Sequence, residues 1–163
     1  MRASFLLSLG RAVVVLALAT ASCGSSSSSN PDSFVGAWTF QSGSIVPNCA
    51  GITLSDIDLT GDAVTITKVD STHVAMVVAA TGAMCNVRFT VSGDTATADA
   101  GQTCAISDSG YSATLNVSRW TLSMASGTIT MSMSGTASVS IISCAPTSTG
   151  TMVRGGSDAA QAG

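Results

Sequence analysis

From Phe34 onward, the chain is built of short stretches in which apolar and polar residues alternate, separated by turns that contain glycine. In "VGAWTF" the side chains of Trp38 and Phe40 fall on one face. A period of two residues is typical of β-strands that bury one face. Turns such as "TGD" and "SGD" suit tight hairpin connections because glycine tolerates positive φ. The alternation therefore predicts an antiparallel β-sheet.

Composition points to the same fold class. The 163-residue chain has no Glu and a single lysine, Lys68, whereas helices usually carry these residues on their exposed faces. A sheet of roughly ten short strands must close or double to bury its apolar face and remove its edges. We therefore expect one all-β domain over 34–153, an up-and-down meander closing as a barrel. A β-sandwich is the alternative.

Three segments carry less regular patterns. "ITLSDIDLTGD" (52–62) predicts a strand with a bulge near Ser55, where the alternation changes phase. "HVAMVVAA" (73–80) is continuously apolar and predicts a strand buried on both faces. The tail 154–163, rich in small and polar residues, is expected to be disordered.

Residues 1–22 are typical of an export signal. Arg2 and Arg11 carry positive charge, and the apolar run "AVVVLALA" (12–19) is followed by small residues. The run is shorter than the roughly 20 residues that a spanning helix needs. We therefore expect a helical signal peptide over 1–22, with an uncleaved membrane anchor as the alternative.

The stretch "TASC" (20–23) resembles the lipobox of bacterial lipoproteins. This resemblance implies that cleavage exposes Cys23 and that acyl chains on Cys23 anchor the protein in the bacterial envelope. Gly24 stands where many inner-membrane lipoproteins have Asp, which implies the outer membrane. The Ser-rich stretch that follows suits a flexible tether, so lipidated Cys23 and tether occupy 23–33. Ordinary signal-peptidase cleavage, with Cys23 free or paired, is the alternative.

Five cysteines in an exported chain leave one unpaired, and a lipid on Cys23 accounts for it. The remaining four permit three connectivities, and an oxidising compartment favours pairing. Cys85 and Cys104 flank a predicted hairpin, "NVRFTVSGDTATADAG", which brings them close together. We therefore favour Cys85–Cys104, which leaves Cys49–Cys144.

No pattern indicates a catalytic centre, a metal site or a cofactor. The chain has no C-x-x-C. Asp56 and Asp58 have the opening spacing of a calcium loop, but its twelfth position is Thr67 rather than a bidentate carboxylate. A Ser-His-Asp triad would need His73, the only histidine, which lacks a nucleophile elbow and is expected in a turn. We predict a non-enzymatic protein.

Four residues are candidates for the core or for a pocket. Trp38 and Trp120 are the only tryptophans, and we expect both to be buried anchors. Met131 and Met133 fall on one strand face, where methionine fills core gaps or lines a pocket. Their thioethers also suit Cu(I), which is the alternative.

The opening of the domain, "FVGAWTF", is similar to the G-x-W first strand of lipocalin-like barrels, with Gly36 and Trp38 at the matching positions. This resemblance implies a lipocalin-like barrel, and a barrel interior would accept a small apolar ligand. Arg119, next to Trp120, is the candidate for an arginine that lies near a tryptophan.

The formal net charge of −3 argues against nucleic acid as a partner. We expect a cell-envelope lipoprotein, attached to the membrane through Cys23, that acts as a binding or structural module with a small apolar ligand or an envelope protein as partner. The alternative is a protein-binding module, such as a hydrolase inhibitor, that uses a protruding loop at "QSGSIVPN" (41–48).

Overall fold

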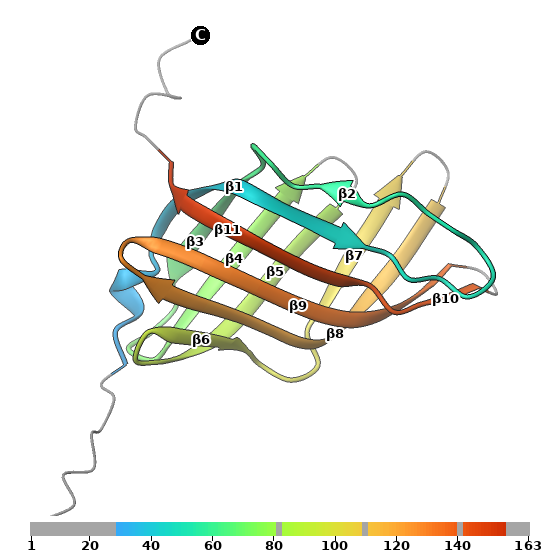
Figure 1. Ribbon diagram of the computed structural model, residues 1–163. Coiled ribbons are helices and arrows are strands. Elements are labelled where there is room, and N and C mark those ends of the chain that lie inside the picture. The colour runs from blue at the N-terminus through green and yellow to red at the C-terminus, as the bar shows by residue number, and fades with distance from the viewer. Residues whose placement is uncertain (1–28, 81–82, 109–110, 140–141, 156–163) are drawn as a thin grey trace, which may run out of the picture.

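The computed structural model describes residues 29–80, 83–108, 111–139 and 142–155, so the predicted signal peptide and Cys23 lie outside the described residues. In these ranges the chain is almost entirely β-structure (Figure 1). The elements are the 3-10 helix η1 (Pro31–Ser33) and the strands β1 (Gly36–Val46), β2 (Ile57–Asp58), β3 (Ala63–Lys68), β4 (His73–Ala80), β5 (Ala83–Ser92), β6 (Thr95–Ala98), β7 (Thr103–Asp108), β8 (Tyr111–Ala125), β9 (Thr128–Val139), β10 (Ile142–Cys144) and β11 (Thr147–Arg154). None of the described helices is long and apolar enough to cross a membrane.

The strands close into an antiparallel barrel with eight strand positions. Except for β2–β3, β6–β7 and β10–β11, strands that follow one another in the chain are paired. Strand β11 pairs with both β9 and β1, which completes the circle. Three positions are shared: β2 and β3 both pair with β1, β6 and β7 both lie between β5 and β8, and β10 and β11 both pair with β9. The predicted barrel is confirmed, and the β-sandwich alternative is wrong.

The barrel interior is a packed apolar core. In β3 and β11, for example, alternate residues are buried, as the period of two predicts. The largest fully buried side chains belong to Trp38, Phe34, Phe89, Ile66, Met76, Leu122, Ile129 and Met152. Methionine fills several interior positions because its flexible side chain adapts to irregular gaps.

The seam between β1 and β11 depends on a close approach at Gly150. A Cβ atom there would lie 2.8 Å from Cε1 of Phe40, so the phenyl ring occupies the space that a side chain would need. The register of the seam shifts between Phe40 and Ser42, which is typical of a β-bulge. Phe40 thus packs across the seam on a residue that must remain small.

One end of the barrel, called here the η1 end, is covered by the start and the end of the domain (Figure 1). Trp38 Nε1 donates a hydrogen bond of 2.8 Å to the carbonyl oxygen of Phe34. The guanidinium of Arg154 lies 4.7 Å from the Trp38 ring centroid and donates to the carbonyls of Val35 and Ser33. The arginine beside a tryptophan is therefore Arg154, and Arg119 is exposed instead.

These contacts correct two expected boundaries. Strand β11 continues through Arg154, the first residue of the predicted disordered tail, because Arg154 pairs opposite Trp38 and stacks on its ring. At the other end, η1 occupies part of the predicted 23–33 tether, since buried Pro31 packs at the start of the barrel. The ordered domain is thus slightly longer than 34–153.

Both disulfides form with the favoured pairing, Cys85–Cys104 and Cys49–Cys144. Cys85 and Cys104 face one another in the β5–β7 pairing, beside the hairpin that the sequence predicted. Cys49 ties the long connection after β1 to β10, where Ala50 also donates a backbone hydrogen bond to Ser143. The second disulfide therefore fixes the end of the barrel opposite η1.

Two strand predictions are wrong. Within 52–62 only the two-residue β2 forms, and Leu59 is the one apolar side chain that reaches the core, because the chain leaves the barrel wall after β1. Strand β4 is not buried on both faces: Val74 and Met76 are buried, whereas Val77 is exposed. Val77 therefore lies on the outer face of the barrel.

Candidate functional site: a cavity at one end of the barrel

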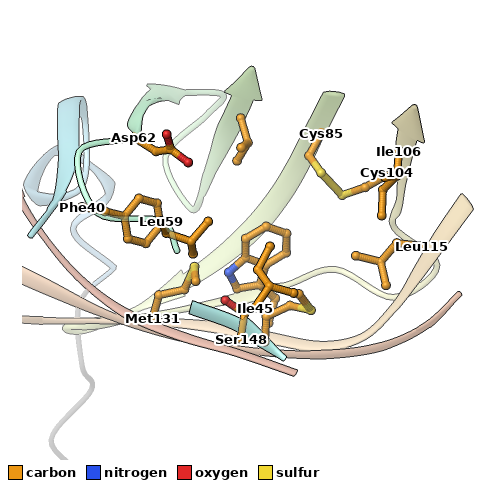
Figure 2. Close-up of a pocket in the computed structure, with 13 residues that line it drawn as sticks. Phe40, Ile45, Leu59, Asp62, Cys85, Cys104, Ile106, Leu115, Met131 and Ser148 are labelled. Atoms are coloured by element: carbon orange, nitrogen blue, oxygen red, sulfur yellow. A yellow bond between two sulfur atoms is a disulfide. The ribbon is translucent and has the colours of Figure 1, made fainter. Parts of the chain in front are cut away.

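An apolar cavity of about 70 Å³ lies inside the barrel at the end opposite η1, which we call the cavity end (Figure 2). In this view Phe40, Leu59 and Met131 lie on one side, and the Cys85–Cys104 disulfide and Leu115 lie on the other. The remaining apolar lining includes Val78 and Met133. Strands from all around the barrel therefore contribute to one small chamber.

Trp120 lines the chamber with its ring and carries an unpaired polar atom. The residue is 5% exposed, and its ring stacks edge-on against Phe89 with a centroid separation of 5.9 Å. Among the described residues, Nε1 of Trp120 is the only buried side-chain nitrogen or oxygen without a hydrogen-bond partner. Such groups are rare in folded proteins because burying an unpaired donor costs about 1–3 kcal/mol. Trp120 thus leaves an unpaired donor buried in the core, behind the apolar wall of the chamber.

The methionine pair lies where the sequence suggested. Met131 and Met133 are buried on the inward face of β9, and Met133 pairs opposite Trp120 of β8. Both line the cavity and also fill much of the interior. The cavity is consequently smaller than the roughly 300–1,000 Å³ of ordinary ligand pockets. It suits a small group rather than a long chain or a large ring system.

Two further polar side chains line the cavity. Ser148 Oγ donates to the carbonyl oxygen of Ser44, so its proton is already used. Asp62 lies in the connection that leads into β3 and is half-buried. Of the lining residues in the described ranges, none is Lys, Arg or His, so the chamber offers no positive charge to an anion.

An apolar segment is exposed near the disulfide at the cavity end. Ile52, Leu54 and Ile57 are 43%, 51% and 55% exposed. The Cys49–Cys144 disulfide holds the start of this segment against β10. The loop predicted at 41–48 is wrong, because β1 continues to Val46, and the exposed loop is 47–56 instead.

His73 lies at the η1 end, as the first residue of β4 rather than within a turn. Its Nδ1 is 2.8 Å from Oδ1 of Asp70 and 2.9 Å from Oγ1 of Thr72, and Arg88 Nη2 lies 3.3 Å from the same carboxylate. The backbone N–H of Thr72, and then the His73 ring, hold the pKa of Asp70 well below its usual range. This cluster braces the β3–β4 turn, remote from the cavity.

Asp58, one of the two acidic residues of the calcium-like stretch, stabilises a turn. Asp58 Oδ1 accepts a hydrogen bond of 2.9 Å from the backbone N–H of Thr60, which lowers the pKa of Asp58. This is the local pattern of an Asx turn, in which the side chain replaces a backbone acceptor. Asp56 is exposed on the same connection.

The sequence identified Trp120, Met131 and Met133 as candidates, and the structure brings these three to one cavity while placing Trp38 at the opposite end. The sequence did not identify Asp62 and Ser148 as lining residues, because no local pattern shows which polar residues meet after the barrel closes. Comparison of the chain with protein-family models, curated proteins and solved structures finds no significant match.

Proposed function

We propose that this chain is a cell-envelope lipoprotein whose barrel is a non-enzymatic binding module for a small apolar ligand. The observation that carries the proposal is the apolar cavity of about 70 Å³ between Trp120, Met131 and Met133. Apolar chambers of this kind bind small apolar molecules because a water molecule finds few hydrogen-bond partners in them. The G-x-W resemblance and the arginine stacked on Trp38 support a lipocalin-like barrel.

The ligand is tested by native mass spectrometry of the protein purified from its own envelope. We expect a small-molecule adduct that Val78→Phe removes, because residue 78 lines the cavity and a phenyl ring would fill it. Val77→Phe is the matched control, since Val77 is the next residue and points outward. Protein without an adduct, or an adduct unaffected by Val78→Phe, would refute a ligand in this cavity.

The proposed anchor agrees with the position of the first described residues. Ser29 donates a hydrogen bond to the carbonyl of Val91 at the η1 end, six residues after Cys23. Six extended residues span about 20 Å. Strand β1 has eleven residues and, tilted as in barrels, covers about 25 Å or more along the axis. A lipid on Cys23 would therefore not allow the cavity end to face into the membrane.

Palmitate labelling tests the anchor. We expect label on the wild-type chain and its loss in Cys23→Ser, with the protein moving from the membrane to the soluble envelope fraction. Acyl chains on one cysteine each contribute about 0.8 kcal/mol per buried methylene, enough for stable attachment when more than one is present. Label that persists in Cys23→Ser would overturn the assignment, whereas Cys49→Ser should leave labelling intact.

The second candidate is a protein-binding module, favoured by the exposed Ile52, Leu54 and Ile57. A clustered set of apolar side chains outside the core is typical of an interaction surface. In the same mass spectra this function predicts a bound protein rather than a small adduct. Ile52→Ser combined with Leu54→Ser should then release that protein, and Val69→Ser, exposed at the η1 end, should not.

A further inference from the structure

We infer that the ligand of the barrel cavity is an unbranched hydrocarbon chain, of which only the end enters the cavity. The next part of the chain lies along an apolar strip at the mouth, formed by Leu59, Ile57 and Ile45. A polar head group at the far end of the chain stays in water outside the barrel. The inference rests on the proposed function and names the chemical class of the ligand.

The chemistry of the cavity wall argues against a polar group inside it. The surface that the wall presents to the cavity is entirely apolar, although Asp62 and Ser148 are among the lining residues. Ser148 is 3% exposed, and its hydroxyl donates to the carbonyl oxygen of Ser44. A carbonyl or hydroxyl group of a ligand would lose its hydration there without gaining a hydrogen bond. The inserted part of the ligand is therefore hydrocarbon.

The volume of the cavity limits how much of the ligand enters. A cavity of about 150 Å³ with an apolar lining holds benzene, which has six heavy atoms. The cavity here measures about 70 Å³, so it holds roughly three or four heavy atoms. A free molecule of that size would bind with a Kd of roughly 0.04–0.5 mM at best. A ligand that stays bound during purification must therefore make further contacts outside the cavity.

The mouth of the cavity lies where its lining residues are partly exposed. Trp120 and Met131 are buried and form part of the inner wall. Ile45, Val78 and Ile106 also line the cavity but are only half-buried. These three residues belong to β1, β4 and β7, close to where each strand reaches the cavity end of the barrel. A chain can therefore enter from that end.

An apolar strip continues from the cavity through this mouth. Ile57 of β2 pairs directly opposite Ile45 of β1, and directly opposed side chains share one face of a sheet. The backbone N–H of Leu59 donates to the carbonyl oxygen of Gly43, so the pairing with β1 continues to Leu59, and alternate residues Ile57 and Leu59 face the same way. Leu59 lines the cavity and is 9% exposed, whereas Ile57 is 55% exposed (Figure 2). The apolar surface of the cavity thus extends onto Ile57 outside the barrel.

The shape of this surface favours a chain over a compact molecule. A ring system is too large for a cavity that holds three or four heavy atoms, and a molecule small enough for the cavity would leave Ile57 uncovered. A hydrocarbon chain covers both, because its methylene groups follow one another in a single row. Each methylene that becomes fully buried raises the affinity about fourfold.

Straight-chain alcohols of increasing length test the inference. The protein is the chain from Gly24 onward, because the core is formed wholly by residues after that point. The carbon atoms of butanol suffice to fill the cavity, whereas hexanol and octanol extend along the strip. Binding is followed through the methyl signals of Met133, in the cavity, and Ile57, on the strip. We expect the affinity to rise about two- to fourfold with each added methylene, and the Ile57 signal to move only with hexanol and octanol.

The variant Ile57→Ser removes the outer part of the strip while leaving the cavity intact. Octanol should then lose most of its advantage over butanol, whereas xenon, which needs only the cavity, should still shift the Met133 methyl signal. Val69→Ser is the matched control, because Val69 is 48% exposed but lies at the η1 end. Octanol binding should be unchanged in Val69→Ser. Retained xenon binding shows that each variant is folded.

Octyl glucoside tests the position of the head group. Its bulky head should not reduce binding by more than about twofold relative to octanol, because the head stays in water. Exclusion of octyl glucoside would mean that the cavity encloses the whole ligand, which overturns the inference.

The remaining outcomes separate the inference from the proposed function. If xenon binds but octanol binds no more tightly than butanol, or if Ile57→Ser leaves octanol binding unchanged, the chain along the strip is wrong and a small apolar ligand in the cavity still stands. If neither xenon nor any alcohol perturbs the Met133 signal, the proposed ligand-binding function fails as well.

Discussion

Reduction of the Cys49–Cys144 disulfide is expected to lower the free energy of unfolding by about 4.7 kcal/mol. The two cysteines are 95 residues apart, so the bond removes much of the conformational freedom of the unfolded chain. The same chain-entropy estimate gives about 3.2 kcal/mol for Cys85–Cys104, whose separation is 19 residues. The free energy of unfolding of a domain is only about 5–15 kcal/mol, so the Cys49–Cys144 disulfide accounts for a large share of it.

The comparison requires two single-disulfide proteins, Cys85→Ala/Cys104→Ala and Cys49→Ala/Cys144→Ala. Urea unfolding of each, with and without a thiol reductant, gives the contribution of the remaining bond while both of its sulfur atoms stay in place. This design matters because Cys85 and Cys104 are buried, and truncating them would add a cavity cost to the measured loss. Equal losses, or a larger loss for Cys85–Cys104, would contradict the prediction.

The barrel was predictable because the sequence patterns that specify it are local and recur along the chain. Alternation in β1 and β3 places Trp38, Phe40, Val64 and Ile66 inside, and glycine turns fix antiparallel neighbours. The hairpin between β5 and β6 also fixed the Cys85–Cys104 pairing. Closure follows because an open meander of this length would leave two unpaired edges.

Other features depend on contacts that only closure creates. Ile52 and Leu54 alternate like strand residues, yet they are exposed, because they lie outside the strands that pair with β1, which are β11, β3 and β2. Nothing local distinguishes Trp120 from Trp38. Their difference arises because the Phe34 carbonyl reaches one indole, whereas the other faces residues brought together from distant strands.

Trp38→Ala is expected to cost about 3–5 kcal/mol, the second-largest effect, because a fully buried indole leaves a cavity that the rigid barrel cannot collapse around. The substitution also removes the hydrogen bond to Phe34 and the ring beneath Arg154. Thermal and urea unfolding of the oxidised protein measure the loss. Amide exchange should rise first around η1, since Trp38 joins the start of the domain to its last strand.

Two further variants divide that cost among its causes. Trp38→Phe keeps an aromatic ring, so its free energy of unfolding should fall by about half as much as in Trp38→Ala. The remaining loss arises because the Phe34 carbonyl loses its donor and part of the indole volume is left empty. Arg154→Met retains an apolar stem and should cost about 1–2 kcal/mol, because the guanidinium is exposed and its contacts are partly replaced by water. If Arg154→Met lowered the free energy of unfolding as much as Trp38→Ala, the η1 end would be stabilised mainly by the arginine rather than by the buried indole. The exposed contacts of Arg154 would then hold the start of the domain against the barrel.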